Sequence, residues 1–172
     1  MKILDVGCGS GIYQDITTQR GEVNFDIEKP KHKIKRFVLG NAEILPFKNN
    51  SFEKSLFIDV IEHVNNPCYC LKELKRVTKH KIIVGTPNAI WLPKILRCFT
   101  KGNYEVYSDH IATYGIPELS QLFDRVGFKN YTIKTSNYRM DNLNKIHYTI
   151  IKLFPKALQG RQILAEIKLM EK

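Results

Sequence analysis

The sequence predicts an α/β fold with a mainly parallel sheet, and two observations carry this prediction. Short apolar runs of strand length alternate with amphipathic stretches of helical period, and turns rich in Gly, Pro and Asn separate them. The first apolar run ends in a glycine-rich turn, which is typical of the carboxyl end of a buried parallel strand. The predicted strands are residues 2–6, 22–27, 36–39, 54–58, 81–85, 130–135 and 162–170.

The predicted helices lie between these strands. Residues 12–19 follow the glycine turn, and residues 68–78 place apolar side chains at the 3–4 spacing of an amphipathic helix. Residues 117–126 begin at a proline and end before Gly127, which fits the usual start and stop signals. Residues 140–154 also have a helical pattern, whereas the stretch 88–113 fits no simple period.

Length and composition indicate one domain, residues 1–172, with an excursion at about 89–113. No apolar run approaches the ~18–20 residues that span a bilayer, and the early Asp5 argues against a signal peptide, so no membrane partner is expected. The four cysteines form no Cys-x-x-Cys pair, which predicts reduced thiols in a cytoplasmic protein and argues against a zinc knuckle. The net charge of +10 has two interpretations, a solvated lysine-rich surface or an anionic partner such as RNA.

The turn at residues 7–11 is the most informative stretch. Gly7, Gly9 and Gly11 let the backbone approach a ligand closely, and the helix predicted after them offers free N–H groups. A dinucleotide fingerprint needs a glycine where this chain has Ile12, and no Gly-Lys-Ser/Thr follows, so neither NAD nor a P-loop is favoured. Asp26 ends the second predicted strand, where a carboxylate can accept both hydroxyls of a ribose.

The order of these and later motifs resembles the class I S-adenosylmethionine-dependent methyltransferases, in particular the small type 11 group. The resemblance covers roughly residues 3–130 and implies a Rossmann-like three-layer sandwich with a mainly parallel seven-stranded sheet. Its motifs are Leu4 to Gly11, Asp26, Gly40 to Phe47, Ser51 to Glu53, Glu62 to Val64, Leu71 to Val77, Thr86 to Asn88, Asp109-His110 and Glu118 to Phe128.

The resemblance also implies a set of residues that bind the cofactor S-adenosyl-L-methionine. The glycines would wrap the methionine part, Asp5 would approach its amino group, Asp26 would hold the ribose, and Ile27 would pack on the adenine. Asn41 stands where the family has Asp, and its oxygen can still accept from an N–H donor. The complete predicted set is Asp5, Gly7, Cys8, Gly9, Gly11, Asp26, Ile27, Asn41, Ala42, Phe57 and Ile58.

The sequence departs from the family's pattern in two places. The family has one or two helices before the first strand, but here the strand begins at Ile3, so those helices are expected to be absent. Upstream chain, another element or a second subunit would then cover that face of the sheet, and a homodimer is one such arrangement. The segment between Asp26 and Gly40 is short and basic, which predicts a loop in place of the usual helix.

The expected chemistry is an in-line methyl transfer. The methyl of a sulfonium is already a good electrophile, so no metal is expected, and orientation alone contributes several kcal/mol. His63 and His110 are the candidates for a general base, with a structural role as the alternative for each, and Glu62 is expected to be structural. Trp91, Tyr104 and Tyr107 either line an acceptor pocket or build a satellite core.

Together these features predict an S-adenosylmethionine-dependent methyltransferase that acts on a small molecule. Two alternatives stay open: an RNA-directed methyltransferase, suggested by the basic charge, and a cofactor-binding module without turnover.

Overall fold

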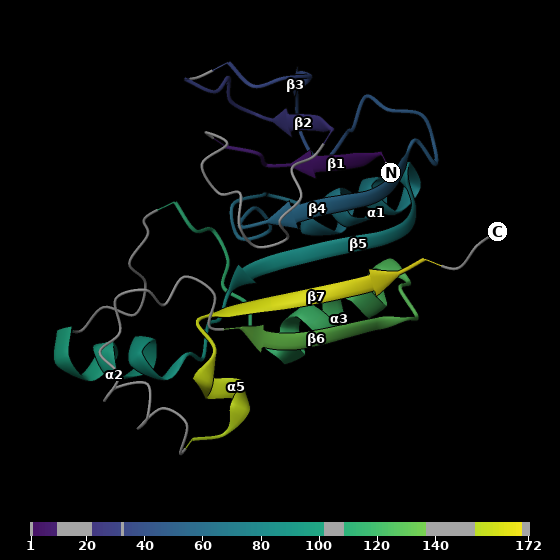
Figure 1. The fold of residues 1–172 in the computed structure, drawn as a ribbon. Coiled ribbons are helices and arrows are strands. Elements are labelled where there is room, and N and C mark those ends of the chain that lie inside the picture. The colour runs from purple at the N-terminus through teal and green to yellow at the C-terminus, as the bar shows by residue number, and fades with distance from the viewer. Residues whose placement is uncertain (1, 10–21, 32, 102–108, 137–153, 170–172) are drawn as a thin grey trace.

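A computed structural model gives the fold of the chain and describes residues 2–9, 22–31, 33–101, 109–136 and 154–169 (Figure 1). Within these residues the chain forms a seven-stranded sheet with the strand order β3-β2-β1-β4-β5-β7-β6. The strands are β1 (Ile3–Val6), β2 (Val23–Asp26), β3 (Phe37–Leu39), β4 (Phe52–Ile58), β5 (Thr78–Pro87), β6 (Tyr131–Ser136) and β7 (Gln162–Lys168).

The sheet confirms the predicted fold class and is mixed in one place. β1 to β5 pair in parallel, whereas β7 runs antiparallel to both of its neighbours, β5 and β6. The chain starts in the middle of the sheet, moves outward to β3 and then returns to β4 beside β1. The strand order therefore reverses between β1 and β4, and ligands of open α/β sheets bind at the carboxyl ends of the strands at such a point.

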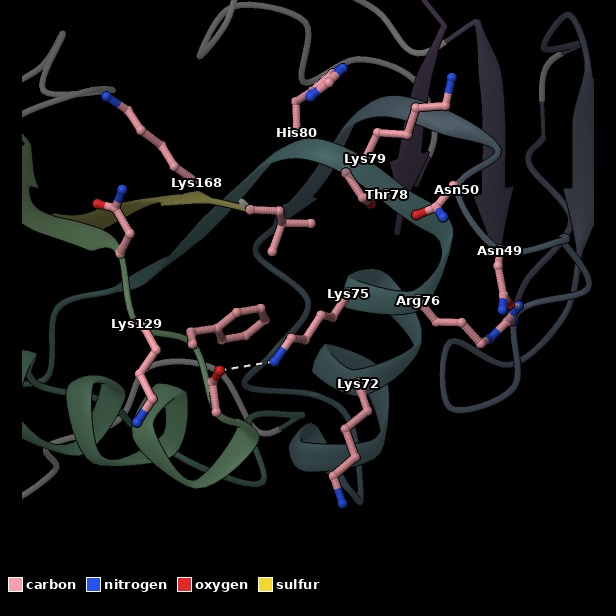
Figure 2. A pocket seen from close by; sticks show the side chains of 14 residues that line it. Asn49, Asn50, Lys72, Lys75, Arg76, Thr78, Lys79, His80, Lys129 and Lys168 are labelled. Carbon is pink, nitrogen blue, oxygen red and sulfur yellow. Dashed lines mark hydrogen bonds between the residues drawn. The ribbon is translucent and has the colours of Figure 1, made fainter. Parts of the chain in front are cut away.

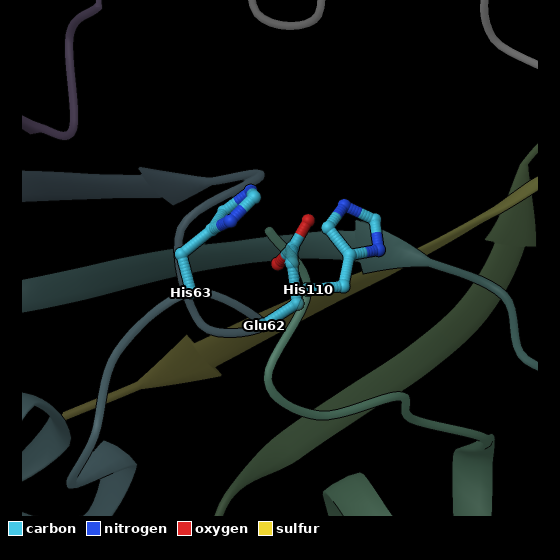
Figure 3. A group of neighbouring side chains, drawn as sticks. All are labelled: Glu62, His63 and His110. Atoms are coloured by element: carbon cyan, nitrogen blue, oxygen red, sulfur yellow. The ribbon is translucent and has the colours of Figure 1, made fainter. Parts of the chain in front are cut away.

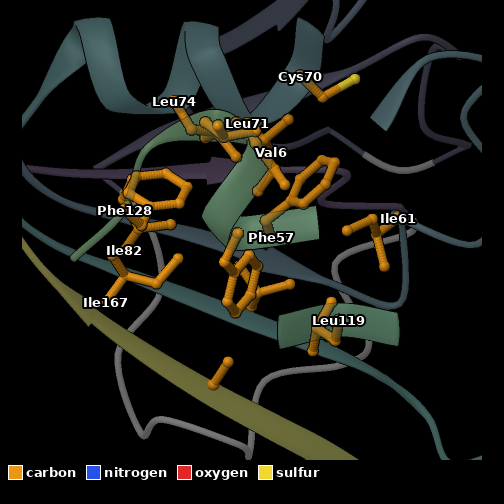
Figure 4. Close-up of a cluster of buried hydrophobic side chains, with 14 of the residues drawn as sticks. Val6, Phe57, Ile61, Cys70, Leu71, Leu74, Ile82, Leu119, Phe128 and Ile167 are labelled. Atoms are coloured by element: carbon orange, nitrogen blue, oxygen red, sulfur yellow. The ribbon is translucent and has the colours of Figure 1, made fainter. Parts of the chain in front are cut away.

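Two helices cover one face of the sheet, and the main core lies beneath them (Figure 4). They are α1 (Pro67–Val77) and α3 (Ile116–Val126); α2 (Leu92–Lys101) and the short α5 (Lys156–Gln159) lie near the carboxyl ends of the strands (Figure 1). The Asn66 side chain caps α1, and Gly127 ends α3 in the left-handed conformation with φ 79°. Fully buried side chains from both helices meet the strands: Cys70, Leu71, Leu74, Val77, Leu119 and Phe123.

α1 also holds the loop that leads from β3 to β4. The Glu73 carboxylate accepts the N–H of Leu45 at 2.8 Å, and Arg76 donates to the carbonyls of Phe47 at 2.7 Å and Leu45 at 2.9 Å. Glu73 and Arg76 pair with each other at 2.7 Å, so each orients the other toward the loop. The charged residues of the 71–77 motif therefore position the 40–47 motif.

β5 is longer than the predicted strand 81–85. The prediction missed its first residues because they are polar. The buried Thr78 hydroxyl pairs with the Ser55 hydroxyl at 2.6 Å, so a polar residue fits into the core there. Lys79 and His80 point outward and contact the Glu53 carboxylate at 2.8 and 2.9 Å. Such cross-strand pairs stabilise a strand that lacks an apolar run.

Other predicted elements differ more from the structure or lie outside it. α2 lies in the stretch that was predicted to fit no simple period, and this prediction was wrong for residues 92–101. Their apolar side chains recur at helical spacing, although Leu96 and Phe99 are 53% and 83% exposed. The predicted helix 12–19 lies outside the described residues, as does the predicted helix 140–154 up to residue 153. In the part of the chain that is described, no helix combines the length and the apolar character needed to cross a bilayer.

We expect Leu74→Ala to lower the free energy of unfolding by about 2–5 kcal/mol, because it opens a cavity between α1 and the sheet. Leu96→Ala, on the exposed side of α2, is the matched control and should change it by less than about 0.5 kcal/mol. Urea unfolding of both variants measures the difference, and an equal loss in the two would contradict this description of the core.

Candidate functional site

The glycine turn after β1 folds back onto the end of β2. Gly7 and Gly9 adopt the left-handed region, with φ of 79° and 54°. The N–H groups of Gly7 and Cys8 both donate to the carbonyl of Phe25, at 2.8 and 3.2 Å. These bonds turn the chain sharply at the carboxyl end of β1, above the centre of the sheet.

The Asp26 carboxylate closes this turn. Its Oδ2 accepts the N–H of Gly9 at 2.7 Å, and its Oδ1 accepts the N–H of Glu28 at 3.0 Å. A carboxylate has about four lone-pair positions, so each oxygen can accept a further donor. The two sequence features predicted to bind one nucleoside, the turn and the acidic residue, are therefore in direct contact.

The two glycines of the turn are required for different reasons. A Cβ on Gly7 would lie 2.0 Å from Cγ2 of Val60, in the loop after β4, so the close packing of two loops excludes any side chain. A Cβ on Gly9 would have no atom of the described residues within 4 Å, so among these residues the space beside Asp26 is open. That open space is where a ligand can approach the backbone.

The site is acidic. Burial raises the pKa of the Asp5 carboxyl to about 6, and the negative charge of Asp26 adds to the rise. Burial and the same two carboxylates raise the pKa of the Cys8 thiol to about 12, so Cys8 is a neutral thiol rather than a nucleophile. The paired carboxylates favour a cationic ligand and disfavour an anionic one.

The remaining residues of the predicted cofactor set have varied surroundings. Ile27 is 69% exposed and offers an apolar surface next to Asp26. The Asn41 side-chain oxygen accepts the N–H of Glu43 at 2.9 Å and so shapes the turn after β3, where Ala42 is half-buried. Phe57 is fully buried in the core, whereas Ile58 is half-buried at the end of β4. Gly11 lies outside the described residues.

Glu62, His63 and His110 form a cluster on the loop side of β4 and β5 (Figure 3). One ligand atom from each, a carboxylate oxygen or a ring nitrogen, lies within 4.8 Å of the others. The two imidazole rings meet edge to face with centroids 4.8 Å apart. The structure therefore brings together both histidines predicted as bases, and it adds a carboxylate that the sequence did not assign to the site.

Backbone hydrogen bonds join the two segments that carry this cluster. The carbonyl of Glu62 accepts the N–H groups of Ile111 at 2.9 Å and Ala112 at 3.2 Å. Farther along, Tyr114 pairs with Asn88 in a parallel bridge beyond the end of β5, and its carbonyl accepts the N–H of Ala89 at 2.9 Å. Residues 109–114 thus lie along the ends of β4 and β5, which places His110 beside the 62–63 turn.

The Glu62 carboxyl is buried, with 1% of the residue exposed. Its Oε2 accepts the hydroxyl of Thr86 at 3.0 Å, while its Oε1 is also buried and has no hydrogen-bond partner among the described residues. Burial raises the pKa of this carboxyl to about 8, and the Asp59 carboxylate adds to the rise. A buried oxygen without a partner is uncommon and calls for an explanation.

The predicted acceptor residues are only partly described. Trp91 is half-buried just before α2, and the Arg161 guanidinium lies 5.9 Å from the centre of its ring. Tyr104 and Tyr107 lie outside the described residues, and so does part of the predicted excursion 89–113. Asn88 anchors the start of that excursion, because its amide donates to the carbonyls of Ala157 at 2.8 Å and Gly160 at 2.7 Å.

A basic pocket of about 860 Å³ lies at the opposite edge of the sheet, where β5 begins and β7 ends (Figure 2). Three of its cations already have protein partners. Lys75 donates to the carbonyl of Gly127 at 2.9 Å, Arg76 pairs with Glu73, and Lys79 pairs with Glu53. The pocket is remote from the candidate site, and the carboxylates of Glu73 and Glu53 compensate part of its positive charge.

We expect Gly7→Ala to lower the free energy of unfolding by about 2–5 kcal/mol. Backbone strain at this left-handed position and the clash with Val60 both contribute to the loss. Gly9→Ala should cost only about 1–2 kcal/mol, because strain acts there without a clash. Denaturant unfolding compares the two, and adding Val60→Ala should recover part of the loss in Gly7→Ala only. Equal losses for the two glycines would contradict the close packing of these loops.

Glu62→Gln should make stability less dependent on pH. The folded pKa of about 8 lies above the ordinary value of 4.5, so between these values the folded chain keeps a proton that the unfolded chain releases. The resulting stabilisation is complete below the unfolded pKa and is lost as pH rises toward 8, by up to about 1.4 kcal/mol per pH unit. Unfolding in metal-free buffer at about pH 5 and about pH 8 should show a smaller decline for the variant. An unchanged decline would show that Glu62 titrates normally.

Known proteins resemble this chain over the part that carries the glycine turn and Asp26. Residues 4–83 match a family described as methyltransferase domain. A protein of Methanocaldococcus jannaschii, named only as uncharacterized, is 34% identical over 112 residues, which are 60% of this chain and 43% of that protein. Another from the same organism is 38% identical over 85 residues, 46% of this chain and 36% of that protein. The chain thus spans less than half the length of these two curated relatives.

Solved structures share the fold at low sequence identity. A SAM-dependent methyltransferase from Thermotoga maritima has a TM-score of 0.72 at 19% identity, covering 97% of this chain and 81% of that one. A SAM-dependent methyltransferase from Archaeoglobus fulgidus has a TM-score of 0.68 at 16% identity, covering 98% and 86%. Residues 4–83 therefore match the methyltransferase domain family, and the chain has the fold of these S-adenosylmethionine-dependent methyltransferases.

Proposed function

We propose that this chain is an S-adenosylmethionine-dependent methyltransferase that transfers the methyl group to a small molecule. The observation that carries the proposal is the 2.7 Å hydrogen bond from the Gly9 N–H to the Asp26 carboxylate. It joins the carboxyl ends of β1 and β2 at the point where the strand order reverses, and the open side of Gly9 leaves room for a ligand there.

The charge of the site fits this cofactor better than a dinucleotide. S-adenosyl-L-methionine carries positive charge on its sulfonium and amino groups, whereas a dinucleotide carries a negatively charged pyrophosphate. The charge of Asp26 raises the pKa of the Asp5 carboxyl, so a cationic ligand relieves the repulsion between the two groups. An anionic ligand would increase that repulsion.

Each residue of the site has a distinct role in this proposal. When bound, the cofactor supplies an electrophilic methyl group on a sulfonium. Asp26 accepts the ribose hydroxyls, Asp5 faces the amino group, and Ile27 packs on the adenine. His63 and His110, held at the ends of β4 and β5, are in position to take a proton from an acceptor. The protein's contribution is mainly to orient the two reactants.

Asp26→Ala should weaken the binding of S-adenosyl-L-methionine by about 1–3 kcal/mol, because it removes charge-assisted hydrogen bonds. Glu28→Ala is the matched control: it removes an exposed charge from the same loop and should leave the affinity nearly unchanged. Titration calorimetry measures both. Equal affinities for wild type and Asp26→Ala would exclude Asp26 from the ribose site.

Turnover is tested by following S-adenosylhomocysteine with pools of small hydroxyl- or amine-bearing molecules and, separately, with RNA. Transfer to the small molecules supports the proposal. Transfer to RNA with a steep dependence on salt would favour the RNA-directed alternative instead. Tight cofactor binding without product from any acceptor would favour a binding module without turnover.

A further inference from the structure

We propose that Glu62, His63 and His110 form a binding site for a divalent metal ion of the zinc type. Two imidazoles and one carboxylate are a donor set that proteins use for Zn²⁺ and for iron, and an ion held by three protein ligands keeps open positions. The three donor atoms lie within 4.8 Å of one another, although His110 is far from the other two in the sequence. Donors on one zinc ion lie ~3.3 Å apart, given bonds of about 2.0–2.2 Å, so modest side-chain rotation would close the site.

The unpartnered oxygen of Glu62 is an independent observation that points to a cation. Glu62 is 1% exposed, and its Oε1 has no hydrogen-bond partner among the described residues. In Figure 3 the carboxylate of Glu62 lies beside the two imidazole rings, and one of its oxygens points toward them. A buried carboxylate without compensation is costly, and a bound cation would supply that compensation.

The surroundings hold the ligands as the outer partners of metal sites do. His63 Nδ1 lies 3.1 Å from the carbonyl of Asp109, and a carbonyl can only accept, so Nδ1 carries the proton and Nε2 keeps a lone pair for a metal. The Thr86 hydroxyl holds the other oxygen of Glu62 at 3.0 Å. The backbone bonds from Ile111 and Ala112 to the carbonyl of Glu62 keep His110 beside the turn.

If the chain is a methyltransferase, as proposed above, a metal ion at this site indicates which chemical group of the acceptor is methylated. An ion with an open position binds an oxygen ligand and lowers the pKa of its hydroxyl group. The acceptor would then be a hydroxyl-bearing molecule methylated on oxygen. With the ion bound, His63 and His110 are its ligands and no longer act as the base. The hydroxyl proton then passes to solvent or a buffer base, a C–O bond forms, and the electron pair of the broken C–S bond stays on sulfur.

The binding test uses the full chain without cofactor, titrated with Zn²⁺ in a calorimeter and with Co²⁺ followed by visible absorption. We expect one ion per chain. His110→Ala, His63→Ala and Glu62→Gln should each weaken binding by at least about 10–100-fold, the loss that outer partners of metal sites already cause. His80→Ala is the matched control, since His80 pairs with Glu53 at the opposite edge of the sheet, and it should bind like wild type.

Three results would overturn the metal site: no binding to wild type, equal binding to the three ligand variants, or an equal loss in His80→Ala. Circular dichroism and thermal unfolding check that each variant is folded. If His110→Ala does not fold, His110→Asn and Glu62→Gln carry the test, and unchanged Co²⁺ spectra in both would also overturn it.

Asp26→Ala separates this inference from the proposed function. It should weaken S-adenosyl-L-methionine but leave metal affinity unchanged, because Asp26 lies on β2 and is not a ligand of the cluster. If the wild-type chain binds the metal but not S-adenosyl-L-methionine, the metal site stands and the proposed methyltransferase function is wrong. Cofactor binding and turnover that neither a chelator nor the ligand variants reduce would reject the metal-dependent acceptor.

Discussion

The site depends on the hydrogen bond from the Gly9 N–H to the Asp26 carboxylate. It can form only because β1 and β2 are neighbouring parallel strands that end at the same edge, and because Gly7 turns the chain back at once. Val60 then packs where a Cβ of Gly7 would lie, so the loop after β4 is set against the same turn. One local constraint thus positions the loops of three strands.

The fold could be predicted from the sequence to a large extent, because burial leaves a periodic pattern. The apolar run before Gly7 and the helix between Pro117 and Gly127 lie within a residue or two of the observed elements. The start of β5 was missed, since Thr78 is buried through a hydroxyl pair and Lys79 is compensated by Glu53. A pattern of apolar residues does not report either kind of pairing.

The candidate site could be predicted where its chemistry is local in the sequence. Gly7, Gly9 and Asp26 stand at strand ends, and the sequence predicted that the turn and the carboxylate come together, as the structure shows. Glu62 was expected to be structural, because nothing nearby in the sequence shows that its carboxylate lies close to two imidazoles. That arrangement arises from the backbone bonds of Ile111 and Ala112, which the sequence does not reveal.

Residues 109–114 are held mainly by their backbone, so their path does not depend on the identity of their exposed side chains. Main-chain groups make the bonds that join this segment to Glu62 and to the end of β5. Substitutions at its exposed positions, such as Ile111, would therefore leave the path of the segment intact. The exposed side chains of residues 109–114 can therefore vary while the backbone bonds keep His110 in place.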